Sequence, residues 1–341
     1  MENDSLGLIK FRNREFIKSL DGEIPNAETL AEWNKNFGTD QASFLFYESI
    51  LASQEQKNFI EFVYHQKVES LKPTLKNPIE IFVISSSNEK LARWGSHVDL
   101  MRSWLAELGH VAEELVTFSD NNLLENARLI GEVIQSSHSK KVIVSFGRGS
   151  LEMSLLAKMN EKNRTHDLHS VAAWINLAGS VMGSVEADQI LNSRLLRALA
   201  QVKSFWKKDV LTSLAWASKK NPVWRSGFSS LKHSINVTML PICLEQHIPV
   251  YYKNSFQKLK ALGPNDSQNL LSDQIIRPGF IYPLWRRAVI DDIVSVKQDF
   301  IRLILAIEAI LNQRLGLDFL KEESPESLGV ARKSVLELES Y

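Results

Sequence analysis

The feature that most constrains the fold is a regular alternation of short apolar runs with helix-length segments, which begins at residue 79. The runs at 79–84 and 141–146 are rich in β-branched residues and have the length of strands. Strands that alternate with helices in this way predict a mostly parallel sheet covered by helices on both faces. The six predicted strands span residues 79–84, 111–118, 141–146, 171–177, 235–240 and 280–284.

The segment before this alternation, residues 1–76, predicts an N-terminal helical extension. Its apolar residues recur at helical spacing, and Ser53-Gln54-Glu55-Gln56 has the pattern of a capping box. We expect the α/β domain to cover residues 77–320 and to contain a Trp-rich, cap-like helical insertion at 185–234. Residues 321–341 predict a C-terminal tail.

The composition excludes several classes of protein. The 341 residues carry 40 Lys and Arg against 40 Asp and Glu, so a net charge of zero gives no reason to expect a nucleic-acid partner. The single cysteine, Cys243, cannot form an intramolecular disulfide, and no Cys/His spacing is typical of structural zinc. We therefore expect no metal and no cofactor. The absence of a secretory signal and of a bilayer-length apolar stretch predicts a cytoplasmic protein without a membrane span.

The turn after the predicted strand 141–146 carries the strongest functional signal. The segment Ser145-Phe146-Gly147-Arg148-Gly149 places small residues at alternate positions between a strand and a helix. This arrangement resembles the nucleophile elbow of the α/β-hydrolase superfamily, with Gly147 at the nucleophile position. The segments 124–130, 171–184 and 263–266 resemble bacterial lipase- and esterase-like members of that superfamily. The resemblance runs in order from 79 to 314 and implies that Asp266 stands at the position of the catalytic acid.

The chain departs from the family pattern at each catalytic element. Gly147 has no hydroxyl with which to attack an acyl carbon. The family order places the histidine after the acid, but none of the eight histidines follows Asp266. The segment 282–289, where that base would stand, offers Arg286 and Arg287, which stay protonated. The loop after the first strand, 85–89, lacks the glycine that the family usually has there.

The remaining candidate residues each have a functional and a structural interpretation. Ser150 and Ser145 are alternative hydroxyls for catalysis, but a first-turn serine and a strand-end serine more often serve the local structure. Asp266 either keeps a role in the site or caps a turn. Arg148, Gly149, Arg286 and Arg287 predict a small cationic pocket for a carboxylate or phosphate, or else surface positions.

Together these observations favour a hydrolase relative that has lost its activity, a pseudoenzyme that binds a small acyl or anionic ligand or a protein partner. An active ester or lipid hydrolase with a relocated nucleophile and base is the first alternative. The second is an interaction protein that binds its partner through the N-terminal helices.

Overall fold

A single parallel sheet organises the molecule. The computed structural model describes residues 17, 20, 22–67, 79–86, 95–118, 122–136, 139–163, 166–203, 210–225, 228–285 and 293–313. Within these residues six strands pair in the order β2-β1-β3-β4-β5-β6, and all neighbours are parallel. The strands are β1 Ile79–Ser86, β2 Ala112–Thr117, β3 Lys140–Phe146, β4 Val171–Leu177, β5 Ile235–Ile242 and β6 Phe280–Trp285. The predicted parallel α/β fold is confirmed. Strand β3, which leads into the Gly-rich turn, lies in the interior of the sheet between β1 and β4.

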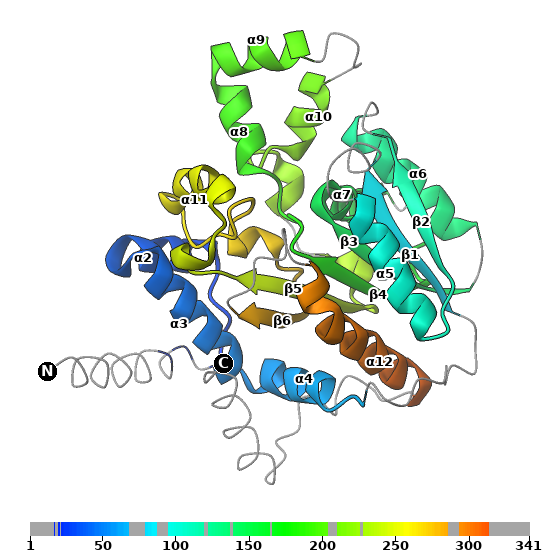
Figure 1. Ribbon diagram of the computed structural model, residues 1–341. Helices are drawn as coiled ribbons and strands as arrows, with labels where there is room; N and C mark the ends of the chain where they lie inside the picture. Colours follow the sequence, from blue (N-terminus) through cyan, green and yellow to red (C-terminus); the bar gives the residue numbers. More distant parts are fainter. Residues whose placement is uncertain are drawn as a thin grey trace, which may run out of the picture.

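Helices cover both faces of this sheet (Figure 1). One face packs against α4 (Gln54–Tyr64), α5 (Gly95–Glu107) and α12 (Lys297–Gln313). The opposite face packs against α6 (Leu123–Gln135) and α7 (Gly147–Asn163). Strand β3 is buried on both sides: Val142 and Val144 contact the first helical layer, and Ile143 contacts the second. Double burial explains why this strand reads as a continuous apolar run rather than an alternating one.

The N-terminal helices are part of the same core. Helices α2 (Ala27–Phe37) and α3 (Thr39–Ala52) bury a third apolar cluster against β5 and β6. The cluster includes Leu30, Phe46 and Ile50 from the helices and Leu240 and Ile281 from the strands. The crossover between β5 and β6 contains the short helix α11 (Lys253–Lys260), so α2 and α3 supply much of the cover over these two strands.

The capping box predicted at Ser53-Gln54-Glu55-Gln56 does not form. Ser53 is the N-cap of α4, but its side chain makes no cap hydrogen bond. Gln56 instead points at β6, where Oε1 accepts from the Ile281 backbone N–H at 2.7 Å and Nε2 donates to the Gly279 carbonyl at 3.4 Å. The pattern correctly predicted that a helix begins after Ser53. Gln56 bonds to distant backbone groups instead of the backbone of Ser53.

The cap-like insertion forms three helices, α8 (Val185–Asn192), α9 (Arg194–Lys203) and α10 (Val210–Ala217), that project away from the rest of the molecule (Figure 1). They follow β4 and therefore rise from the carboxyl edge of the sheet. None of the described helices is both long and apolar enough to cross a bilayer. Residues 68–78, which include the end of the predicted N-terminal extension, and the predicted tail at 321–341 lie outside the described residues.

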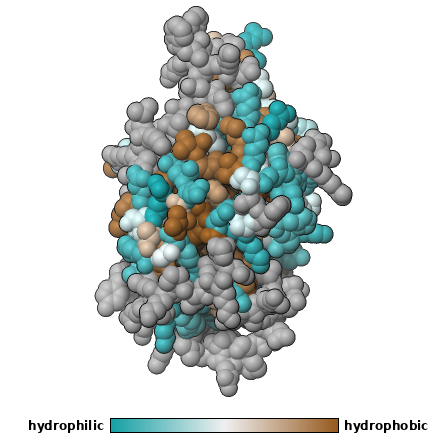
Figure 2. All heavy atoms as spheres, turned by 90° about the vertical axis from the view of Figure 1, so that its right-hand side faces the viewer, coloured by the Kyte–Doolittle hydropathy of each residue, from teal (hydrophilic) through white to brown (hydrophobic). Residues whose placement is uncertain are grey.

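Strand β2 forms one edge of the sheet. Figure 2 views the molecule from this side and shows hydrophobic residues gathered in the middle of the face, with hydrophilic residues around them. Val111 and Phe118, which flank β2, are both exposed. Two charged residues lie at this edge: the Arg102 Nε donates to the Ala112 carbonyl at 3.1 Å, and Glu113 is exposed. Charged side chains on an edge strand disfavour pairing with another chain.

The packing of α3 generates the first prediction. Phe46 is fully buried against the sheet, so Phe46→Ala should lower the free energy of unfolding by about 3–5 kcal/mol. Phe37→Ala, at a side chain that is 51% exposed, is the matched control and should cost far less. Denaturant unfolding followed by tryptophan fluorescence should show one transition that shifts as a whole for Phe46→Ala. An early, separate transition with the main one unmoved would mean that the N-terminal helices fold independently of the sheet.

Candidate functional site

The turn from β3 into α7 has the geometry of a nucleophile elbow. Gly147 follows the last residue of β3 and has φ of +53°, in the left-handed region that glycine occupies without a steric penalty. Two residues on, α7 passes so close to β1 that a Cβ on Gly149 would lie 2.8 Å from the Ile84 Cγ2. Gly147 therefore takes the left-handed turn without strain, and the path of the backbone leaves little room for a side chain at Gly149. Gly147 thus stands at the left-handed turn between strand and helix and carries no side chain there.

The two nearby hydroxyls are buried beneath this turn. Ser145 and Ser150 have no exposed surface, and the Ser150 Oγ donates to the Ser145 Oγ at 3.0 Å. The indole Nε1 of Trp174 also donates to the Ser145 Oγ, at 2.8 Å. A Cβ on Gly179 would lie 2.0 Å from the Ser150 Oγ, so the loop after β4 closes directly over this hydroxyl. The two serines thus form an internal hydrogen-bonded cluster, and neither is presented to a substrate.

Asp266 lies in a tight loop that its own carboxylate organises. The Oδ1 accepts the backbone N–H groups of Gln268 and Asn269 at 2.9 and 2.7 Å. The Oδ2 accepts from Nε2 of Gln274 at 3.1 Å, and the residue is 1% exposed. Burial raises the pKa of Asp266 from its ordinary value of 3.8 to about 6, although the accepted hydrogen bonds work against that rise.

Hydrogen bonds join the Asp266 loop to the loop after β4. Asn176, near the end of β4, donates from Nδ2 to the Gly179 carbonyl at 2.8 Å and to the Gln274 carbonyl at 2.7 Å. The Asn269 Nδ2 donates to the carbonyl of Ala178 at 3.1 Å. The loop that covers Ser150 is therefore held by two residues that follow Asp266 in the chain, Asn269 and Gln274. The structure brings the turn at Gly147, the loop after β4 and the Asp266 loop together at the carboxyl edge of the sheet.

Arg148 is engaged by a carboxylate on its own helix. Its Nε donates to Glu152 Oε1 at 2.8 Å, one helical turn away. Glu152 is fully buried and also accepts from the Asn126 Nδ2 at 2.6 Å. Burial raises the pKa of Glu152, while the Arg148 guanidinium opposes that rise. The positive charge expected at the elbow is thus balanced by Glu152 within the protein.

Two of the predicted site residues are not among those that the structure describes. Arg286, Arg287 and residues 87–89 of the loop after β1 lie outside the described residues. Two histidines before β4 contact other side chains: the His166 Nδ1 lies 3.3 Å from Gln135 Oε1, and the His169 ring packs on His233. In the part of the chain that the structure describes, no three His, Cys, Asp or Glu side chains gather as metal ligands.

Sequence reasoning missed the partners that fix these candidates in place. The pairing of Arg148 with Glu152 could have been found, because residues four apart on a helix are neighbours. A polar residue at the end of the apolar run 171–177 likewise marked Asn176 as a residue with a specific partner. The contacts of Trp174 with Ser145, and of Gln274 with Asp266, join residues from separate strands and loops and left no local signal.

Several solved structures are similar to this one. The metagenomic carboxyl esterase MGS0156 is 15% identical with a TM-score of 0.51, over 71% of this chain and 77% of the esterase. The mature Bacillus licheniformis lipase BlEst2 is 16% identical with a TM-score of 0.46, over 73% of this chain and 95% of the lipase. The mouse alpha/beta hydrolase domain-containing protein 10 is 14% identical with a TM-score of 0.42, over 70% and 92% of the two chains. No family model and no curated protein matches the sequence.

The likeness to the metagenomic esterase bears on the fold alone. The sheet order, the left-handed turn after β3 and the likeness to the metagenomic esterase define an α/β-hydrolase fold. The resemblance seen in the sequence is thereby confirmed at the level of architecture. The identities are too low to carry the activity of an esterase or a lipase to this chain.

The burial of Asp266 generates the second prediction. Its folded pKa of about 6 exceeds the ordinary 3.8 of an unfolded chain, so between these values the folded state keeps a proton that the unfolded state releases. The free energy of unfolding should therefore fall by about 2 kcal/mol while the pH rises from 4 to 6. Asp266→Asn removes this dependence, and the Gln274 Oε1, which has no hydrogen-bond partner among the described residues, can turn to accept from the new amide.

The measurement is urea unfolding of wild type and Asp266→Asn at several pH values. The variant should match wild type near pH 4 and become the more stable protein above pH 6. Asp99→Asn, at an exposed carboxylate, is the control and should follow wild type. A variant that is less stable than wild type at pH 8 would show that the ionised carboxylate stabilises the loop more than its burial costs.

Proposed function

We propose that this protein is a non-catalytic relative of the α/β hydrolases that binds a small acyl or anionic ligand at the carboxyl edge of its sheet. The observation that carries the proposal is Gly147 at the apex of the elbow, with φ of +53°. A serine nucleophile in this fold depends on that one position, because the turn aims its side chain away from the sheet. Glycine keeps the turn and removes the attacking atom.

The surrounding residues support the loss of acyl transfer. Activating a serine requires a base within hydrogen-bond reach, and no histidine follows Asp266 in this chain. The partners of the Ser145 and Ser150 hydroxyls are each other and the Trp174 indole, which cannot accept a proton at neutral pH. The two carboxylate oxygens of Asp266 accept hydrogen bonds from two backbone N–H groups and from the Gln274 side chain. Each part of a catalytic triad is absent or committed to local structure.

The elbow keeps one element of hydrolase chemistry, which is its backbone donors. Gly147, Arg148 and Gly149 open a 17-residue helix, and their N–H groups belong to its first turn. The aligned peptide dipoles favour an acceptor or an anion at this end of α7. Because Glu152 balances the Arg148 guanidinium, these N–H groups rather than a side-chain charge would hold the carbonyl or carboxylate of a ligand. Arg286 and Arg287 remain proposed contributors.

The third prediction tests for residual catalysis. Wild type should hydrolyse p-nitrophenyl acetate and p-nitrophenyl butyrate no faster than a heat-denatured sample at equal concentration. Ser150→Ala and Ser145→Ala should leave this background unchanged, since neither hydroxyl is exposed. Turnover by wild type that one of these variants abolishes would establish an active hydrolase with a relocated nucleophile and overturn the proposal.

The fourth prediction concerns the restored nucleophile. Gly147→Ser places a Cβ at a positive φ, which should lower the free energy of unfolding by about 1–2 kcal/mol. The new hydroxyl has no base to take its proton, so ester hydrolysis should stay at the wild-type background. Gly109→Ser, at a second glycine of positive φ that lies outside the site, is the matched control for strain. Efficient turnover by Gly147→Ser alone would show that a competent base is already in place, against the account given for Asp266 and the histidines.

A further inference from the structure

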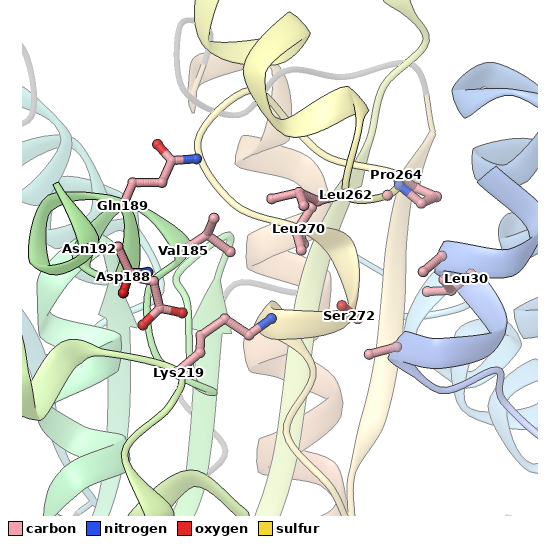
Figure 3. A pocket seen from close by; sticks show the side chains of 13 residues that line it. Leu30, Val185, Asp188, Gln189, Asn192, Lys219, Leu262, Pro264, Leu270 and Ser272 are labelled. Carbon is pink, nitrogen blue, oxygen red and sulfur yellow. The ribbon is translucent and has the colours of Figure 1, made fainter. Parts of the chain in front are cut away.

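A cavity has the N-terminal helix α2 as one wall (Figure 3). Its volume is about 440 Å³, within the range of about 300–1,000 Å³ that is typical of small-molecule sites. It is lined by parts of α2 and α8, by Lys219 and by the loop that contains Asp266. The lining contains no residue of the elbow segment 145–150, so this cavity is distinct from the site proposed above.

The wall formed by α2 is held at both ends. Before the helix, the carbonyl of Pro25 accepts from the Arg277 Nη2 at 2.8 Å. Near its end, the Asn34 Nδ2 donates to the Lys260 carbonyl at 2.8 Å. Leu30 anchors the middle of the helix in the core, while Ala27 and Ala31, one turn apart, face the cavity with small side chains. The space is therefore preformed by a fixed helix that presents alanines where larger residues would fill it.

Apolar and polar residues occupy opposite sides of the cavity. Figure 3 shows Leu30, Leu262 and Leu270 on one side and the polar side chains of α8 on the other. The polar side consists of Asp188, Gln189, Asn192 and Lys219, whereas Ser272 lies on the side of Leu270. A ligand that satisfies both sides has an apolar body and a single polar end.

The ionic contacts decide which polar end fits. The Lys219 ammonium lies 2.7 Å from both carboxylate oxygens of Asp273, which is 4% exposed, so its charge is already neutralised. Asp188 accepts from the Ser218 hydroxyl with Oδ1, and no cation among the lining residues neutralises it. Lys220, which does not line the cavity, donates to the Asn192 Oδ1 at 3.3 Å. The lining thus offers a carboxylate acceptor at Asp188, which attracts a hydrogen-bond donor and repels a carboxylate.

We propose that this cavity binds a small amphipathic molecule whose apolar body lies against Leu30, Leu262 and Leu270 and whose amine or hydroxyl head donates to Asp188. The shared chemistry of the head is hydrogen-bond donation, and an ammonium adds a charge-assisted contact. Binding here does not depend on the loss of hydrolase activity, since the elbow contributes nothing to the lining.

The probes are octylamine, octanol and octanoate, which share one chain length and differ in the head. Calorimetry on the full chain should rank octylamine first, with octanoate weaker by about tenfold or more. Asp188→Asn keeps the shape of the side chain and should bring octylamine and octanoate to within about threefold of each other. Glu186→Gln, which removes an exposed charge from the same helix outside the cavity, is the matched control and should keep the ranking.

A steric variant locates the site. Ala31→Trp should abolish binding of all three probes, whereas Glu32→Trp, on the adjacent exposed position that does not line the cavity, should bind as wild type does. If Ala31→Trp does not fold, Ala27→Phe tests the same wall. The proposal is overturned if no probe binds wild type, if octanoate binds as tightly as octylamine, or if folded Ala31→Trp or Ala27→Phe binds like wild type.

Discussion

The close approach of α7 to the sheet is the constraint on which the arrangement of this molecule depends. A helix that leaves an interior strand through a left-handed residue must pass over its neighbours at backbone distance, and here a Cβ on Gly149 would lie 2.8 Å from Ile84. The same approach recurs on the other side, where Gly179 leaves room for Ser150. An added Cβ would collide with the Ile84 side chain and carbonyl oxygen at Gly149, and with the Ser150 and Asn176 side chains at Gly179. Side chains larger than hydrogen are therefore disfavoured at both positions, and the turn persists whether or not it carries a nucleophile.

The polar side chains around the elbow bond to one another and to the backbone, so they hold the shape of the turn and its neighbouring loop. Ser145, Ser150 and Trp174 fill the space under the turn, and Asn176 fastens the loop above it. The Asp266 carboxylate accepts a backbone N–H of its own loop, and this bond keeps the residue buried. Burial disfavours the ionised form, which is why the pKa of Asp266 is raised. In an active hydrolase such a carboxylate orients a histidine. In this chain the Asp266 carboxylate orders a loop that bonds to the loop after β4 and lines the cavity beside α2.

The sequence predicted the architecture better than the partners within it. Strand β3 was recognisable because burial on both faces requires an unbroken apolar run, and Gly147 because the turn needs small residues at fixed spacing. Gln56 was assigned to a local capping box, but it bonds to β6, more than 200 residues away in the chain. The cavity could not be predicted from the sequence. It exists partly because Ala27 and Ala31 have small side chains, and a small side chain is no local sign of a pocket. Local pattern fixes elements, whereas pockets and long-range polar pairs arise only when the elements pack.

The central claim is that no serine near the elbow is an activated nucleophile, so none forms a covalent intermediate with an ester or a covalent adduct with a serine-directed probe. Intact-protein mass spectrometry after incubation with a fluorophosphonate probe tests it most directly, with an active serine hydrolase of the same fold treated in parallel. The account predicts complete labelling of that hydrolase and an unchanged mass for this protein. An adduct of one probe per chain, mapped by peptide analysis to Ser150 or Ser145, would contradict it.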